Sequence, residues 1–167
     1  DGCGAPWEFD PGPGVRCPAC TARPRAFDRA RAACLYDEHS RDLILKLKHA
    51  DRTDLAPMLG RWMARAGTEL LRDADLIVPV PLYWRRGWGR RYNQSGALAT
   101  VIGKLSRVAV GGEMLKRIRP TTQQVGLSRT ERAKNVQGAF RVPDHRKADV
   151  KGRRIVLVDD VLTSGAT

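Results

Sequence analysis

Hydrophobic positions follow a helical period in three parts of the chain. Leu43, Ile44 and Leu47 share one face of a helix predicted for residues 41–49, which Ser40 would cap. A second helix begins at a cap residue, position 54, and has a proline in its first turn, where proline is tolerated. A third helix follows position 93. The apolar positions of these two helices are Leu55, Leu59, Trp62, Met63, Leu98, Val101, Ile102 and Leu105.

Two short runs, residues 76–80 and 155–158, are almost wholly apolar, which is typical of strands buried on both faces of a sheet. A further short strand is predicted for residues 32–36, with Cys34 as a buried core residue. Strands that alternate with helices predict an α/β domain with a mainly parallel sheet. Ligands of such domains bind beyond the carboxyl ends of the strands.

Residues 1–27 form a separate segment, rich in glycine and proline, without hydrophobic periodicity. A peptide of this composition buries little apolar surface, so a bound metal is the expected source of its order. Cys17 and Cys20 have the C-x-x-C spacing of half a zinc knuckle. Metal-binding rather than disulfide-forming cysteines favour a reducing, cytoplasmic location. Because the chain starts at Asp1 and ends at Thr167, we expect a fragment trimmed at both ends.

The overall composition excludes two classes of protein. Hydrophobic residues make up 42% of the chain, which argues against disorder throughout. No apolar run approaches the roughly 18 residues that a membrane-spanning helix needs. The net charge is +12, and the excess of basic residues is concentrated between positions 82 and 135. Such a positive region suits phosphate, pyrophosphate or nucleic-acid partners, although a solubilising surface is the alternative.

The sequence after the second apolar run carries the most specific signal. Asp159 and Asp160 follow the strand directly, and two adjacent carboxylates can accept hydrogen bonds from the 2′- and 3′-hydroxyls of a ribose. The hydroxyl and backbone N–H groups of the next turn can surround a 5′-phosphate. This loop resembles the phosphoribosyl pyrophosphate (PRPP) signature of type I phosphoribosyltransferases. Its phosphate-binding residues would be Thr163, Ser164, Gly165, Ala166 and Thr167.

Other ligands are compatible with an acidic strand end. The two carboxylates could instead hold magnesium, as in a receiver or phosphatase domain. A P-loop is excluded, because no Gly-Lys-Thr/Ser follows the strand.

Two further loops suit an anionic ligand. A glycine-spaced, arginine-rich loop follows the first apolar strand, and guanidinium groups of fixed geometry match a pyrophosphate; the alternative is a basic surface turn. Its predicted pyrophosphate-binding residues are Arg85, Arg86, Arg90, Arg91, Asn93 and Gln94.

A long polar excursion then returns to the core at Phe140 and Val142. As a mobile lid it would exclude water from a reactive centre, whereas an ordinary surface hairpin would have no such role. The flexible-loop residues singled out are Arg117, Thr121, Gln124, Arg132 and Asn135.

Together these motifs resemble the competence protein F family (ComF, also GntX-like). Four motifs carry the resemblance: Pro-Val-Pro-Leu at residues 79–82, Arg-Tyr-Asn-Gln at 91–94, Arg-x-x-x-Thr-x-x-Gln at 117–124 and Arg-x-x-Asn at 132–135. The loop at residues 159–167, the N-terminal cysteines and Leu-Lys-Leu-Lys-His at 45–49 also match the family. The resemblance implies a type I phosphoribosyltransferase fold over residues 28–167, with a parallel sheet between helices on both faces and an N-terminal zinc finger. It assigns Cys3, Cys17 and Cys20 as zinc ligands. It also implies a link to natural transformation, and hence to single-stranded DNA and DNA-uptake proteins.

The leading functional hypothesis is a Mg²⁺-dependent phosphoribosyltransferase that binds PRPP. Asp159 and Asp160 would hold the ribose, and the arginine loop would stabilise the departing pyrophosphate. The pyrophosphate and water would supply most of the Mg²⁺ ligands. No residue stands out as a general base, so the acceptor is not identified.

A PRPP sensor or single-stranded-DNA adaptor without turnover is the alternative, with Trp84, Trp88 and Tyr92 as stacking residues. A transcriptional regulator on the same fold is a third reading, although no helix-turn-helix supports it.

Overall fold

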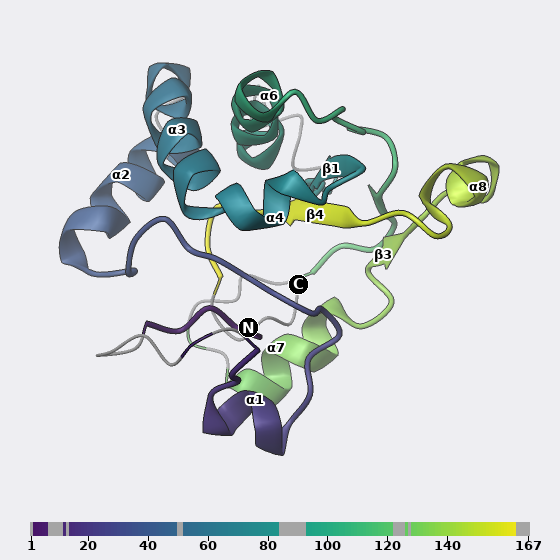
Figure 1. Ribbon diagram of the computed structural model, residues 1–167, viewed down its shortest axis with the longest axis horizontal. Coiled ribbons are helices and arrows are strands. Elements are labelled where there is room, and N and C mark those ends of the chain that lie inside the picture. The colour runs from purple at the N-terminus through teal and green to yellow at the C-terminus, as the bar shows by residue number, and fades with distance from the viewer. Residues whose placement is uncertain are drawn as a thin grey trace.

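The computed structural model describes residues 2–6, 12, 14–49, 52–83, 93–121, 126 and 128–162 (Figure 1). Its secondary structure is mixed α/β, as predicted. The helices are α1 (Pro18–Ala22), α2 (Glu38–His49), α3 (Ala56–Ala66), α4 (Thr68–Arg72), α6 (Gln94–Ser106), α7 (Arg129–Val136) and α8 (Lys147–Val150). Single 3-10 turns occupy Thr53–Leu55 and Asp144–Arg146, and the strands are β1 (Leu76–Pro79), β2 (Lys116–Arg117), β3 (Phe140–Arg141) and β4 (Ile155–Val158).

The two apolar runs form the parallel sheet that their composition predicts. β1 pairs with β4 in register, so that Leu76 lies opposite Ile155 and Pro79 opposite Val158. On its other edge, β1 hydrogen-bonds residues 109–111 through the N–H and the carbonyl of Ile77. Both strands therefore end at the same edge of the sheet, from which the chain continues into the predicted loops.

One face of the sheet carries the hydrophobic core. Helix α6 packs on β1 and β4, and α3 packs on α6. Leu59, Ile77, Leu98 and Ile102 are buried in this core together with Leu47 of α2.

The helices predicted for residues 41–49 and for the segments after positions 54 and 93 are thus confirmed, but Trp62 and Leu105 of the predicted apolar periods are exposed. The prediction that Asp54 caps the second helix is wrong, because α3 starts after Leu55 and the Asp54 carboxylate pairs with Arg52.

Several local predictions are wrong. Residues 32–36 form no strand, and Cys34 is exposed rather than buried. Helix α2 begins at Glu38, because Asp37 caps it through reciprocal hydrogen bonds with Ser40 (both 2.9 Å). β4 is not buried on both faces, since Leu157 is 55% exposed.

The helices occupy both sides of β4 in space, although the core lies on one side. In Figure 1, α3 and α6 lie on one side of β4, and α1 and α7 lie on the other. Residues 26–31, called the strap below, run between β4 and helices α1 and α7 (Figure 1). The strap lines the same cleft as Ile155 and Leu157. None of the helices in the described part of the chain has the length and apolar character needed to span a bilayer.

The long polar excursion has regular structure at both ends. β2 and β3 form a short antiparallel ladder, which closes the excursion where Phe140 was expected to rejoin the core. Helix α7 begins with a capping box, in which Ser128 accepts from the Glu131 N–H and Glu131 accepts from the Ser128 N–H. Arg119 donates to two carbonyls at the other end of α7, at 2.9 and 2.6 Å.

The N-terminal segment is joined to the strap by backbone hydrogen bonds. The Gly2 N–H donates to the Asp28 carbonyl (3.1 Å), and the Ala30 N–H donates to the Gly2 carbonyl (2.7 Å). Arg29 then forms an ion pair with Asp73, which directly follows α4, and Arg31 forms one with Glu69 of α4.

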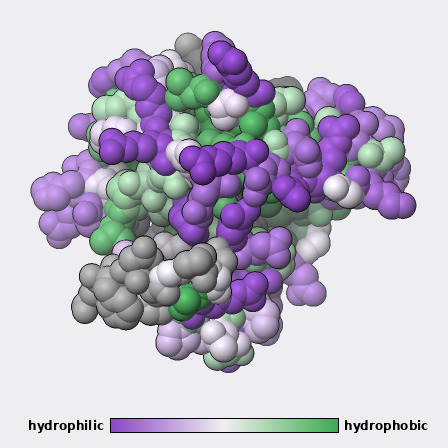
Figure 2. Space-filling model, in the orientation of Figure 1, coloured by the Kyte–Doolittle hydropathy of each residue, from purple (hydrophilic) through white to green (hydrophobic). Residues whose placement is uncertain are grey.

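Figure 2, in the orientation of Figure 1, shows a mostly hydrophilic surface over the described residues, with smaller apolar areas between the hydrophilic ones.

Candidate functional site

Three elements converge on the predicted acidic pair. Asp159 and Asp160 directly follow β4, Ser95 lies in the first turn of α6, and Lys48 lies in the last turn of α2. The Lys48 Nζ lies 3.0 Å from Asp160 Oδ1, and the Ser95 hydroxyl lies 3.3 Å from Asp159 Oδ1. The Asp160 N–H also donates to Asp159 Oδ1 at 2.9 Å. The pair therefore sits at the carboxyl end of a parallel strand, where α/β folds bind ligands.

The environment of Asp159 disfavours its charged form. Burial raises the pKa of Asp159 to about 6, and the adjacent charge of Asp160 contributes in the same direction. The Asp160 N–H, the Lys48 ammonium and the Ser95 hydroxyl work against this increase. Perturbed carboxyl groups of this kind cluster at functional sites, which makes Asp159 a candidate on physical grounds as well as by motif.

Asn93 and Gln94 use their side chains to fix the surrounding backbone. The Asn93 amide donates to the Val80 carbonyl at 3.2 Å, where the chain leaves β1. The Gln94 amide donates to the Lys48 carbonyl at 3.3 Å, and Gln94 is only 2% exposed. Both residues were predicted to bind pyrophosphate; in this structure their amide groups join the start of α6 to the ends of β1 and α2.

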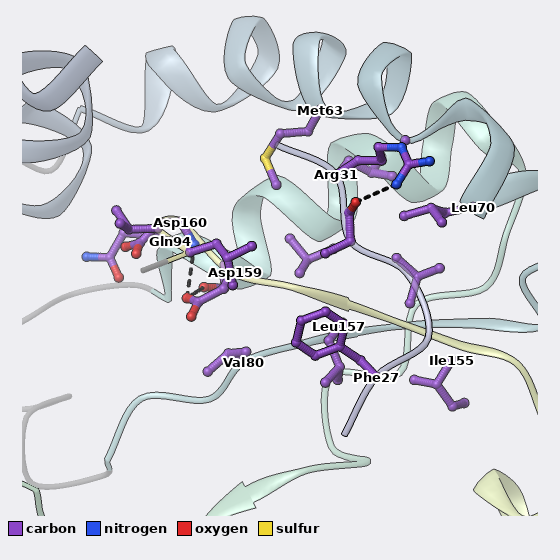
Figure 3. Close-up of a pocket in the computed structure, with 18 of the residues that line it drawn as sticks. Phe27, Arg31, Met63, Leu70, Val80, Gln94, Ile155, Leu157, Asp159 and Asp160 are labelled. Atoms are coloured by element: carbon purple, nitrogen blue, oxygen red, sulfur yellow. Dashed lines mark hydrogen bonds between the residues drawn. The ribbon is translucent and has the colours of Figure 1, made fainter. Parts of the chain in front are cut away.

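A cleft of about 1750 Å³ contains several of the predicted site residues. Figure 3 shows Asp159 and Asp160 near Gln94 at one part of the cleft, while Phe27, Leu157 and Ile155 line it farther along β4. From the flexible-loop prediction, three residues line the same cleft: Arg117, Thr121 and Arg132. The structure thus brings the acidic pair and part of the polar excursion to one cavity.

Arg117 is held in place by neighbours of the excursion itself. Its guanidinium donates to the Thr121 hydroxyl and lies 5.4 Å from the centroid of the Phe140 ring. Thr121 is buried, with 8% of its surface exposed. Asn135 belongs to α7, where its carbonyl accepts from Arg119. These contacts give one end of the predicted lid a defined attachment to the β2–β3 ladder.

The remaining predicted site residues lie outside the described part of the chain. They are Arg85, Arg86, Arg90, Arg91, Gln124, Thr163, Ser164, Gly165, Ala166 and Thr167, together with the stacking candidates Trp84, Trp88 and Tyr92.

Two site residues were not assigned from the sequence. Lys48 falls within the 45–49 stretch that resembles the ComF family, but helical periodicity alone places a lysine there on a solvated face. Ser95 directly follows the Arg-Tyr-Asn-Gln motif, and no local pattern indicates that it contacts an aspartate 64 positions later. Both roles depend on tertiary packing.

The three N-terminal cysteines predicted to bind a metal come together. Their Sγ atoms all lie within 4.8 Å of one another, and those of Cys3 and Cys17 are 3.6 Å apart. Thiolates around a tetrahedral zinc ion, at about 2.3 Å from the metal, are separated by about 3.8 Å. Gly2 keeps this cluster compact, because a Cβ there would lie 3.1 Å from the Cys20 Sγ.

The cluster also favours a thiolate. Burial works to raise the pKa of Cys20, but hydrogen bonds with Cys3, Arg25 and Cys17 outweigh it and lower the pKa to about 7. Thiolates are the metal-binding form of cysteine. Burial raises the pKa of the Cys3 thiol, so Cys20 is the member of the cluster whose thiolate is favoured. All three cysteines have the spacing to hold a metal ion.

Comparison with known proteins identifies relatives over most of the chain. It is 33% identical to the DNA utilization protein YhgH of Salmonella typhimurium, over 99% of this chain and 72% of that protein. Identity is 34% to the Escherichia coli K12 protein of the same name, over 90% and 67% of the two chains. Competence protein F of Haemophilus influenzae is 31% identical, over 90% of this chain and 68% of that protein. No family model and no solved structure matches. The chain belongs to the ComF-like family.

Proposed function

We propose that this chain binds PRPP, as a phosphoribosyltransferase-like protein with a type I phosphoribosyltransferase fold over residues 28–167. The observation that carries the proposal is the acidic pair at the carboxyl end of β4, with Asp159 Oδ1 held by Ser95 and by the Asp160 N–H. In the sequence, the pair is followed two residues later by hydroxyl residues and glycine suited to a 5′-phosphate. The resemblance of this loop to the PRPP signature of type I phosphoribosyltransferases supports the same reading.

Each group has a proposed role in ligand binding. Asp159 and Asp160 accept hydrogen bonds from the ribose hydroxyls, and residues 163–167 hold the 5′-phosphate. The arginines at positions 85, 86, 90 and 91 bind pyrophosphate. Mg²⁺ arrives with the pyrophosphate, because Asp160 is already paired with Lys48 and Mg²⁺ retains phosphate and water ligands. Arg117 and Arg132 reach the same cleft and add positive charge.

Calorimetry with Mg²⁺ and PRPP tests this assignment. The double variant Asp159→Asn/Asp160→Asn keeps the shape of both side chains but removes the charge from their hydrogen bonds to ribose. Hydrogen bonds to charged groups contribute about 1.5–3 kcal/mol each, so we expect affinity to fall about 100-fold. Asp42→Asn, at an exposed position of α2, is the matched control and should bind as the wild type does. Equal affinity of the double variant and the wild type would refute the ribose site.

Catalysis is tested separately from binding. A transferase releases pyrophosphate from PRPP when Mg²⁺ and an acceptor are present, so release is measured over a panel of nucleobases and other nucleophiles. Release that depends on one acceptor supports a glycosyltransferase. PRPP binding without release for any acceptor favours a sensor instead.

A DNA-related role is the second component of the proposal. The relatives are named DNA utilization protein and competence protein F. We propose that this chain likewise acts in DNA uptake, together with DNA-uptake proteins and single-stranded DNA. The net charge of +12 is compatible with phosphate-backbone binding. Filter binding against salt tests the adaptor alternative: affinity should fall steeply with salt, and no affinity at low salt removes it.

Zinc is the metal that we propose for the cysteine cluster. Three sulfur ligands fit a structural zinc site, which requires a fourth ligand in addition to Cys3, Cys17 and Cys20. Its proposed task is to order the segment 1–27, in which Cys20 is the buried apolar residue among those that the structure describes. Metal analysis of the purified protein, repeated with Cys17→Ser/Cys20→Ser, tests the identity of the ion.

A further inference from the structure

Within the described part of the chain, Lys48 forms an ion pair with Asp160 of the acidic pair. Its ammonium lies 3.0 Å from Asp160 Oδ1, with side-chain exposures of 27% for Lys48 and 13% for Asp160. Charges this sheltered are screened less by solvent and salt than charges on the open surface, so the Lys48 ammonium acts strongly on the neighbouring carboxylates. The lysine belongs to α2, whereas the aspartates follow β4, so the contact joins two elements that are distant in sequence.

The backbone at Lys48 is itself fixed from a third element. Gln94, the first residue of α6, is almost fully buried and donates its amide to the Lys48 carbonyl at 3.3 Å. The next residue, Ser95, contacts Asp159. The start of α6 therefore holds the end of α2 with one side chain and the acidic pair with the next.

We propose that Lys48 is a positioning residue for the acidic pair, which orients the Asp160 carboxylate and offsets part of the negative charge of the two aspartates, and that Gln94 positions Lys48. This inference rests on the proposed function in one respect, because the pair it prepares is the proposed ribose site. Without Lys48, two adjacent carboxylates repel each other at partly buried positions, and ligand binding has to overcome that repulsion.

Other charged groups also lie around the cleft, and each comes from a stated element. Arg31 comes from the strap and pairs with Glu69, and Arg41 lines the cleft from α2. Arg117 and Arg132 approach from β2 and α7, and Arg117 contacts Thr121 and Phe140. The charge of Lys48 acts on the Asp159 carboxyl from α2, where it lowers the pKa against the opposing effects of burial and Asp160.

Carboxyl-resolved NMR titration of Asp159 tests the inference without any ligand. Lys48→Met keeps the length of the side chain but removes its charge, so the titration midpoint of Asp159 should move upward from about 6. Lys48→Arg should restore the midpoint. Lys46→Met is the matched control, because Lys46 lies exposed on the same helix two residues away, and it should leave the midpoint unchanged. Gln94→Leu should move the midpoint in the same direction as Lys48→Met.

PRPP calorimetry on the same proteins then connects the electrostatics with function. Lys48→Met should weaken Mg²⁺–PRPP binding by about tenfold, the equivalent of one charged hydrogen bond, and Lys48→Arg should recover most of it. An Asp159 midpoint that is the same in Lys48→Met and wild type, in proteins with the same circular dichroism, overturns the inference. A wild type that does not bind PRPP contradicts the proposed function instead, and the titration still decides the role of Lys48.

Discussion

Asp159 combines two environments that oppose each other. Its carboxyl is buried beside a second carboxylate, which makes ionisation unfavourable, yet it also accepts hydrogen bonds from Ser95 and from the Asp160 N–H. Ribose binding would use the same acceptor capacity. A site of this kind is costly for the ligand-free protein, and strained or destabilised groups are common where a ligand later supplies the missing partners.

Because of these opposing effects on Asp159, the free energy of unfolding should depend on pH. The pKa of Asp159 is raised from 3.8 to about 6 in the fold, so the unfolded chain releases this proton at lower pH than the folded chain. Stability from this group is therefore complete below pH 3.8 and is lost as pH rises to about 6, by up to about 3 kcal/mol.

Asp159→Asn isolates that contribution, because asparagine keeps the acceptor oxygen and has no proton to lose. We expect the variant to be more stable than wild type at pH 8, and the difference to vanish near pH 4. Urea unfolding at several pH values measures it, with Asp42→Asn as the control at an exposed position. A wild type whose advantage over Asp159→Asn grows with pH would contradict the direction of the shift.

Helices α3 and α6 form the most extensive helix–helix contact of the core, and Gly60 permits their approach. A Cβ at Gly60 would lie 2.7 Å from both the Cβ and the Cγ1 of Val101, closer than real side chains pack. Since α6 carries Ser95 at its start and packs on the sheet, this crossing also sets where the acidic pair meets the helix. The α3–α6 contact therefore fixes both the packing of the core and the position of Ser95 beside the acidic pair.

Gly60→Ala should therefore destabilise the fold despite the better helix propensity of alanine. Overpacking costs about 1–3 kcal/mol and the propensity gain returns up to about 1, so we expect a net loss of about 1–2 kcal/mol in thermal or urea unfolding. Val101→Ala in the same protein should recover part of this loss by removing the opposing methyl groups. Gly96→Ala on α6, where the nearest side-chain atom lies at an ordinary 3.4 Å, is the control and should be neutral or stabilising.

Sequence patterns located the main elements because periodicity reflects burial, and burial is strongest in α3, α6, β1 and the buried end of β4. They failed where structure depends on a distant partner. Residues 32–36 are apolar enough for a strand but form no ladder, which leaves Cys34 exposed. Ser128 and Glu131 have the spacing of a capping box, which is a local sequence signal for the start of α7. For the site, the motif identified Asp159 and Asp160, whereas Lys48 joins them through tertiary packing.

On the scale of the whole molecule, two differently stabilised parts are linked by the strap. The segment around the cysteine cluster has Cys20 as its buried apolar residue among those described, whereas the core behind the sheet holds a continuous cluster. The two parts connect through the Gly2–Arg29 bridge and through the Arg29–Asp73 and Arg31–Glu69 ion pairs. Exposed ion pairs contribute about 0–1 kcal/mol each, so these links are weak compared with metal–thiolate bonds.

Removal of the proposed zinc ion should therefore loosen the first part and leave the second intact. After treatment with a strong chelator, we expect hydrogen–deuterium exchange to rise at least about tenfold in residues 14–31, because these amides then lack their main constraint. Amides of β1 and of residues 98–102 in α6 should keep their protection, since their burial does not involve the cluster. Cys17→Ser/Cys20→Ser should reproduce the chelated pattern, whereas Cys34→Ser, an exposed cysteine outside the cluster, should not. Loss of protection throughout the chain on chelation would instead mean that the cluster and the core fold as a single cooperative unit.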